Sequence, residues 1–187
     1  ALLVAVLCGA CFVGGLVWAD EEGGGGFPTP EWAKMGKEQE GFKKSVGDWD
    51  VTMRMWMAPG QPPAESKASA EGSVLWGGRY FMLDYHGDMM GQPFDGKLLM
   101  AFDRVDKEYV SVWIDSMSTY MSVSRGKEKD GAITFKMNDP DWMTGTKKET
   151  EMVWKWVDDD TYVLTFREPT EGGEPRVTMD FTYKRKK

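Results

Sequence analysis

The sequence predicts an all-β protein: an antiparallel up-and-down, lipocalin-like barrel of about ten strands with one short N-terminal helix. Between residues 48 and 184, short segments alternate apolar with polar residues, which is the pattern of half-buried strands. Glycine, proline and aspartate separate these segments and predict turns. Almost no helical pattern lies between them, so an antiparallel sheet must close on itself to protect its edges.

The composition is that of one acidic domain. The chain has 187 residues, of which 41% are hydrophobic, enough for a single core. Lys and Arg number 23 against 30 Asp and Glu, which gives a net charge of −7. The only basic cluster is at 184–187. Because phosphate contacts need clustered basic residues, we expect no nucleic-acid binding.

Residues 1–19 carry no charge and end in Val17-Trp18-Ala19, directly before the acidic Asp20. We interpret 1–19 as a secretory signal peptide, truncated at its start because an initiator Met and a basic region are missing. A retained membrane anchor and a lipoprotein acylated at Cys8 or Cys11 are the alternatives. Both cysteines lie in this segment, so the mature domain would have no disulfide and no cysteine-based metal site.

The remaining chain divides into a linker and a domain. Residues 20–30 are rich in glycine and proline and predict a flexible linker, and 31–187 predict the barrel. After cleavage of the signal we expect no membrane span.

The first expected element is a helix. Thr29-Pro30-Glu31 supplies an N-cap, a proline at the first helical position and an acid in the first turn. Its apolar face would consist of Trp32, Met35, Phe42 and Val46. We expect this face to cover one end of the sheet.

The expected strands then follow in order. Turns separate them, among them a proline-rich turn at 59–63 and a tight hairpin at Gly77-Gly78. The segments with strand-like alternation are 48–58, 65–76, 79–87, 94–103, 108–115, 133–137, 149–156, 162–167 and 177–184. Since each strand pairs with its predecessor in the simplest topology, the last should meet the first.

The inward side chains should form a lining rich in methionine and aromatic residues. In segment 48–58, for example, Trp49, Met53, Met55 and Met57 share one face. Methionine is flexible, so such a lining would adapt to an apolar ligand. The predicted ligand-contacting residues are Met53, Met55, Phe81, Tyr85, Phe135, Met152, Trp154, Phe166 and Met179.

Polar contacts to a ligand are expected from loops at the mouth of the barrel, because loops at such a rim commonly carry them. The candidates are Arg79, Gln92 and Asp115. Hydrogen bonding of the hairpin ends is the rival explanation for these residues.

Gly47-Asp48-Trp49 opens the first strand just after the helix and resembles the Gly-x-Trp signature of lipocalins and the wider calycin group. This resemblance implies that Trp49 packs at the closed end of the barrel beneath a basic residue near the last strand. Lys184 and Arg185 are the candidates for that residue.

Longer stretches at 76–80, 89–94 and 109–117 are similar to a bacterial family of lipocalin-like domains, known as domain of unknown function 1579. The similarity covers 42–183. It implies the barrel and an exported bacterial setting, either periplasmic or secreted. It implies no activity and no catalytic residue.

The residues with potential for chemistry favour binding over catalysis. His86 is the only histidine, with Asp84 two residues before it, and no Gly-x-Ser-x-Gly turn offers a nucleophile. Haem or copper held by His86, the latter with Met89 and Met90, is a weaker alternative. Turn chemistry explains the acidic loops at 138–141 and 158–160 better than calcium does.

Three functions are therefore open. We expect a non-enzymatic domain, without cofactor, that binds a small hydrophobic or amphipathic molecule in the barrel. The alternative is a filled barrel that acts as an interaction module at the cell envelope, with Trp56, Trp76 and Trp142 exposed for contact. An enzyme using Asp84 and His86 is the third.

Overall fold

The computed structural model describes residues 28–187. The predicted signal peptide at 1–19 and most of the predicted linker at 20–30 lie outside this range, so export, the anchor and the lipoprotein remain predictions. Within the described residues, no helix has the length and the apolar character needed to cross a membrane.

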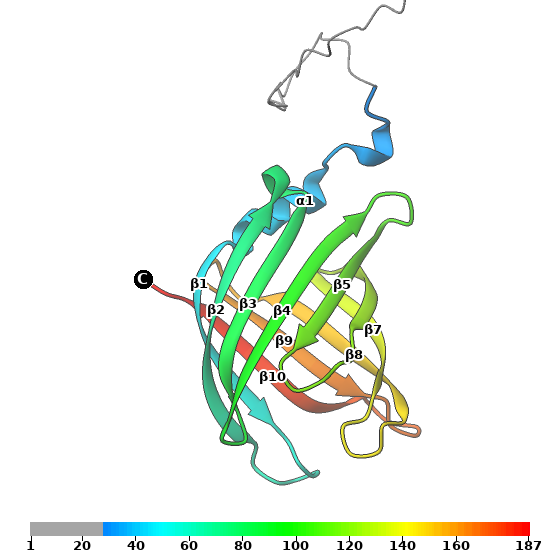
Figure 1. Cartoon of the computed structure of the whole chain (residues 1–187). Coiled ribbons are helices and arrows are strands. Elements are labelled where there is room, and N and C mark those ends of the chain that lie inside the picture. The colour runs from blue at the N-terminus through cyan, green and yellow to red at the C-terminus, as the bar shows by residue number, and fades with distance from the viewer. Residues whose placement is uncertain (1–27) are drawn as a thin grey trace, which may run out of the picture.

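Ten antiparallel strands form one closed barrel, as the sequence predicted (Figure 1). Each strand pairs with the next in sequence, and β10 closes the barrel against β1, with Val51 opposite Tyr183. The strands are β1 (Gly47–Met55), β2 (Ala64–Leu75), β3 (Tyr80–Met89), β4 (Gln92–Asp103), β5 (Glu108–Asp115), β6 (Ser122–Lys129), β7 (Ala132–Pro140), β8 (Lys147–Trp156), β9 (Thr161–Glu168) and β10 (Arg176–Arg185).

The short helical segment before β1 lies over one end of the barrel, as predicted, but it is divided into three pieces. They are η1 (Glu31–Ala33), α1 (Lys37–Gly41) and η2 (Phe42–Ser45). Gly36 is extended, with φ −132° and ψ −172°, so it separates η1 from α1. The prediction of one continuous apolar helix face is therefore wrong in part.

Of that face, only Phe42 is buried, whereas Trp32, Met35 and Val46 are exposed. The polar Gln39 anchors the segment instead. Its side-chain oxygen accepts a hydrogen bond from the Gly36 amide (2.8 Å), and its amide donates to the Phe102 carbonyl of β4 (3.2 Å).

The closed end of the barrel is built around Trp49, which is fully buried. The Trp49 indole donates to the Ser45 carbonyl at 3.1 Å. The Arg185 guanidinium lies 4.3 Å from the centre of the Trp49 ring and donates to the carbonyls of Val46 and Lys44, both at 2.7 Å. The basic residue expected above this tryptophan is therefore Arg185.

A stack of aromatic rings fills the barrel next to Trp49. The Trp154 and Tyr162 rings are stacked at 4.9 Å and 18°, and the Tyr162 and Tyr183 rings at 4.4 Å and 9°. Trp49 meets Tyr162 edge-on at 4.8 Å. Such pairs add to the free energy gained by burying the rings. Aromatic rings thus occupy much of the helix-covered half of the barrel.

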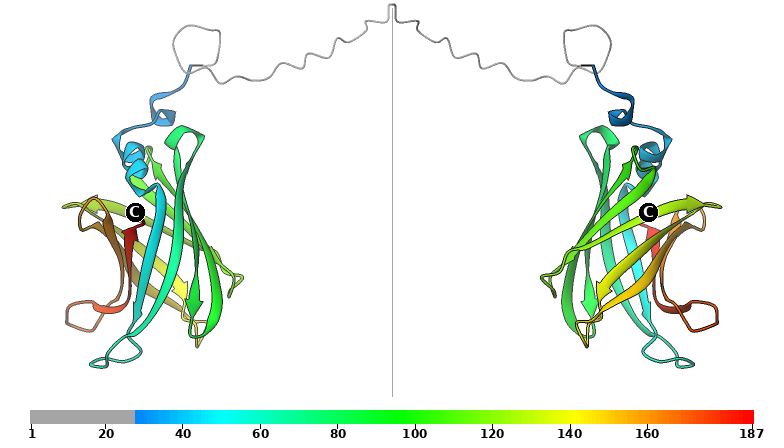
Figure 2. Two further views of the ribbon diagram at one scale, coloured as in Figure 1. Left: turned by 90° about the vertical axis from the view of Figure 1, so that its left-hand side faces the viewer. Right: turned by 90° about the vertical axis from the view of Figure 1, so that its right-hand side faces the viewer.

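The opposite end of the barrel carries the loops that follow β1, β3, β5, β7 and β9 (Figures 1 and 2). We call it the open end. The predicted inward position of Met57 is wrong: β1 ends at Met55, and the exposed Met57 belongs to the loop. Side chains alternate between two faces only along a strand, and the strand has ended before Met57.

Candidate functional site

Six half-buried apolar side chains line the open end of the barrel, and we call them the apolar ring. They pack against the buried core and come from six different strands. The ring consists of Met55, Met89, Trp113, Met137, Phe166 and Met179. Because four of the six are methionines, whose unbranched side chains change rotamer easily, the ring can rearrange around a guest molecule.

The structure places all nine predicted interior residues in one hydrophobic cluster. Six are buried in it, and three lie in the apolar ring. The buried ones are Met53, Phe81, Tyr85, Phe135, Met152 and Trp154; the half-buried ones are Met55, Phe166 and Met179. Their contact with a ligand remains a prediction.

Several buried polar atoms inside the barrel have no hydrogen-bond partner among the described residues. They are the hydroxyls of Ser66, Tyr85 and Tyr162 and the indole nitrogen of Trp154. Leaving a buried donor without a partner costs about 1–3 kcal/mol. Burial raises the pKa of Tyr85 to about 12 and that of Tyr162 well above its ordinary value. Both hydroxyls therefore remain protonated, and can donate, at neutral pH.

Tyr85 links these donors to the apolar ring. Its ring lies 6.3 Å from Trp113 and 5.8 Å from Phe94. Gly87, the next inward position of β3 towards the open end, leaves room beside the Tyr85 hydroxyl: a Cβ there would come within 3.1 Å of the oxygen. A side chain at Gly96 would likewise overlap Trp113. Glycine at these two positions leaves the space that the Tyr85 and Trp113 rings occupy below the opening.

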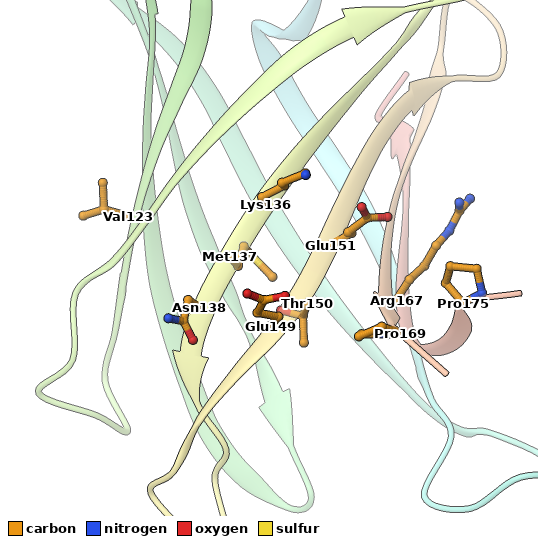
Figure 3. Close-up of a pocket in the computed structure, with 10 residues that line it drawn as sticks. All are labelled: Val123, Lys136, Met137, Asn138, Glu149, Thr150, Glu151, Arg167, Pro169 and Pro175. Atoms are coloured by element: carbon orange, nitrogen blue, oxygen red, sulfur yellow. The ribbon is translucent and has the colours of Figure 1, made fainter. Parts of the chain in front are cut away.

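A groove of about 400 Å³ runs along β7, β8 and β9 beside the open end (Figure 3). The backbone pairing of β6 with β7 begins only at Arg125, and nearer the opening the two strands are joined by the Ser122 hydroxyl, which donates to the Asp139 carboxylate at 2.5 Å. The groove is amphipathic, and its lining includes Val123, Lys136, Met137, Glu151, Arg167 and Pro175. Met137 belongs to both the groove and the apolar ring, whereas Lys136, Glu151 and Arg167 lie on the outer face of β7, β8 and β9.

A charged cluster closes the lip of the barrel beside this groove. The Glu168 carboxylate accepts from Arg176 at 2.6 Å and is paired with Lys148 at 2.8 Å, which joins β8, β9 and β10. Burial alone would raise the pKa of Glu168, but the hydrogen bonds from Lys148 and Arg176 outweigh it, and the pKa is lowered. Both cations are thus neutralised at neutral pH.

The three predicted polar mouth residues do not come together. Arg79 lies between β2 and β3 at the helix-covered end, where it donates to the Ala33 carbonyl at 2.8 Å. Gln92 and Asp115 lie at the open end, on β4 and β5. Asp115 accepts from the Trp113 indole (3.1 Å) and from the Met117 amide (3.0 Å). The expectation of one shared mouth is wrong, because a hairpin's turn places Arg79 at the other end.

His86 lies on the outer face of the barrel. Its Nδ1 atom is 2.7 Å from the Asp95 carboxylate, and both side chains are exposed. Asp84 pairs with Lys97 instead of His86. A shallow hollow of about 200 Å³ surrounds these groups. His86 therefore cannot reach a haem inside the barrel. Among the described residues, no group of three or more His, Cys, Asp or Glu is arranged to hold a metal.

The nine residues predicted to contact a ligand did not include Tyr162, Trp113 and Ser66. Tyr162 and Trp113 stand in strands whose alternation was visible, so the sequence carried a signal for both. Ser66 is small and polar and resembles an outward residue of β2. That a buried donor lacks a partner depends on packing between distant strands and leaves no trace in one sequence.

Residues 34–185 match the family described as "Protein of unknown function (DUF1579)". No curated protein matches the sequence.

Two solved structures have similar barrels. One is the S-type phycobiliprotein lyase CPES from Guillardia theta, with 13% identity and a TM-score of 0.55, covering 82% of this chain and 94% of the lyase. The other is Rv2717c from M. tuberculosis, with 11% identity and a TM-score of 0.52, covering 82% of this chain and 100% of that one. At such identities the similarity shows the fold alone.

Proposed function

Because the chain belongs to the DUF1579 family of proteins of unknown function, we propose a function from its geometry: the open end binds a small, mainly apolar molecule that carries a hydrogen-bond acceptor. The protein would hold this molecule without changing it. The observation that carries the proposal is the buried Tyr85 hydroxyl, which lies without a partner below a ring of flexible methionines; the unpartnered Trp154 and Tyr162 donors lie deeper in the barrel.

The chemistry of the site favours an uncharged ligand. The unpartnered groups are two phenols, an indole and a serine hydroxyl, which donate hydrogen bonds but carry no charge. Two cations at the lip of the barrel, Lys148 and Arg176, are already paired with Glu168. Burying a charge without a partner costs far more than burying a carbonyl that accepts a hydrogen bond. A ketone, amide or ether oxygen fits these donors best.

The groove beside the opening supports a ligand with a polar end. Met137 would contact the apolar part, while Lys136, Glu151 and Arg167 are available to a polar group. The proposed ligand is therefore amphipathic, with its greasy portion in the apolar ring. The candidate acid–base pair of His86 and Asp95 lies on the outer face of β3 and β4, which favours binding over catalysis.

The Tyr85→Phe variant tests this proposal, because removal of the unpartnered hydroxyl should have two opposite effects. We expect the free energy of unfolding of the ligand-free variant to be about 1–3 kcal/mol higher than that of the parent, because the substitution removes a buried polar atom that has no partner. We expect the affinity for a neutral probe with a carbonyl acceptor to fall about tenfold, which corresponds to about 1.4 kcal/mol.

The measurement combines urea unfolding with fluorescence titration using 6-propionyl-2-(dimethylamino)naphthalene, whose emission shifts on leaving water. Tyr109→Phe is the matched control. The Tyr109 hydroxyl already donates to Glu128 at 3.3 Å, so its loss should lower stability and leave the probe affinity unchanged. Loss of stability in Tyr85→Phe together with unchanged affinity would reject the proposal.

A further inference from the structure

Exposed apolar side chains gather on the loops of the open end, and we call them the crown. Met90, Trp142 and Met143 are 78%, 70% and 86% exposed, which is unusual for such large apolar groups. The members come from the four loops that follow β1, β3, β5 and β7. The crown consists of Met57, Met90, Met117, Met121, Trp142 and Met143.

The loops that carry the crown are nearly free of charge. The loops at 56–63, 90–91 and 116–121 contain no Asp, Glu, Lys or Arg. At the helix-covered end, by contrast, the turns at 104–107 and 157–160 are mostly charged. The crown loops are therefore poorer in charge than these turns, although the helix-covered end also exposes large apolar side chains such as Trp32, Trp76 and Val105.

The one charge in the β7–β8 loop is used inside the loop. The Asp141 carboxylate accepts hydrogen bonds from the backbone amides of Met143 and Thr144, both at 3.0 Å, and from the Thr144 hydroxyl at 3.1 Å. These bonds fold the loop into a compact turn, and the intervening Trp142 is held at its tip. Its indole is thus displayed at the open end.

The form of the crown favours a fluid interface over a protein partner. Its apolar side chains stand on separate loops instead of forming one flat face, and a protein partner would need a matching hollow for each. A lipid interface accommodates separate tips, and tryptophan is favoured at the level of the headgroups. Uncharged loops also avoid the cost of moving charges into that region.

Charge selects among lipid surfaces. Glu171 and Glu174 lie exposed on the neighbouring β9–β10 loop, and the whole chain has a net charge of −7. Lys147 and Lys148 begin β8 behind the crown, but Lys148 is paired with Glu168. An anionic membrane would therefore repel this end more than attract it.

We propose that the protein docks by its crown on a zwitterionic phospholipid surface, with Trp142 and Met143 inserted among the headgroups. Docking in this orientation turns the opening of the barrel towards the lipid. The inference does not depend on a ligand inside the barrel, because the crown lies on the loops outside it.

The test is co-sedimentation of the full chain with vesicles of phosphatidylcholine. The double variant W142S/M143S should lower the apparent partition coefficient about tenfold or more. The control W76S/M35S removes an exposed Trp and an exposed Met from the helix-covered end and should leave partitioning unchanged. Since both variants retain residues 1–19, any binding by that segment is the same in each. Replacing half of the lipid with phosphatidylglycerol should not strengthen binding.

A second measurement locates Trp142. Fluorescence quenching by brominated phosphatidylcholine is compared between the parent and Trp142→Phe, and the difference reports this indole alone. Strong quenching of Trp142 is expected. Equal partitioning of the two double variants, or no quenching of Trp142, would overturn the proposal. If light scattering showed instead that W142S/M143S dissociates a dimer, the crown would be an interface between two copies, which also overturns it.

Discussion

Replacing Trp49 by alanine is expected to lower the free energy of unfolding by about 3–5 kcal/mol, the range for truncating a large buried aromatic side chain. Trp49 is fully buried and meets Tyr162 and Trp156 edge-on at 4.8 and 6.0 Å. The substitution would also leave the Ser45 carbonyl without its indole donor and the Arg185 guanidinium without its ring. The closed end would thus lose packing and polar contacts together.

Urea unfolding monitored by circular dichroism measures this effect. Trp32→Ala is the matched control, because Trp32 is 63% exposed and its loss should change stability by no more than about 0.5 kcal/mol. Equal stability of the two variants would show that Trp49 does not hold the closed end together.

Replacing Gly72 by alanine should be the second largest effect, although only one methyl group is added. A Cβ at this position of β2 would overlap the Ser45 carbonyl oxygen and come within 3.1 Å of the Phe81 ring. The Ser45 carbonyl belongs to the backbone and cannot rotate away from the new Cβ as a side chain could, so η2 would have to move off the barrel. Overpacking of this kind costs about 1–3 kcal/mol. Because Ser45 also accepts from Trp49, the effects of the two substitutions should not add.

Gly41→Ala is the control for this prediction. Gly41 has helical φ and ψ of −58° and −27°, and nothing lies within 4 Å of the position that its Cβ would take. There, alanine should raise stability by about 0.5–1 kcal/mol. If thermal unfolding showed that Gly72→Ala is as stable as Gly41→Ala, or more stable, the close approach of η2 to β2 would be contradicted.

The barrel could be predicted from the sequence because alternation is a local signal in nearly every strand. The exception is β6, where the inward positions are Ser122, Ser124 and Gly126. These residues are small because neighbouring rings occupy the space: a Cβ at Gly126 would come within 2.8 Å of Phe135. A strand that makes room for its neighbours has no apolar face, so periodicity alone could not delimit it.

In the N-terminal segment the error is the opposite one: hydrophobic spacing predicted one continuous apolar helix face that the structure does not form. The spacing of Trp32, Met35 and Phe42 fits one helical face, yet Gly36 is extended and two of these side chains are exposed. The segment is held by Gln39 and its bond to Phe102, a contact between residues far apart in sequence. Hydrophobic spacing could not reveal a segment that a polar side chain anchors.

The candidate site could be predicted only in part. The inward residues follow from alternation, and all nine lie in one cluster. The position of Arg79 depended on which end of the barrel each hairpin reaches, and the partner of His86 depended on register, which pairs it with Asp95. The donors without partners come from four strands, β2, β3, β8 and β9, and only the folded barrel brings them into one interior.

The most direct test of the binding proposal is a titration of the ¹⁵N-labelled protein with the naphthalene ketone, followed through the indole N–H signals in heteronuclear NMR spectra. We predict that the Trp154 signal shifts saturably, because its nitrogen is a buried donor without a partner, whereas the Trp49 signal, bonded to Ser45, does not. The same naphthalene without its carbonyl should shift Trp154 less. A Trp154 signal that stays fixed while residues of the outer surface respond would contradict binding inside the barrel.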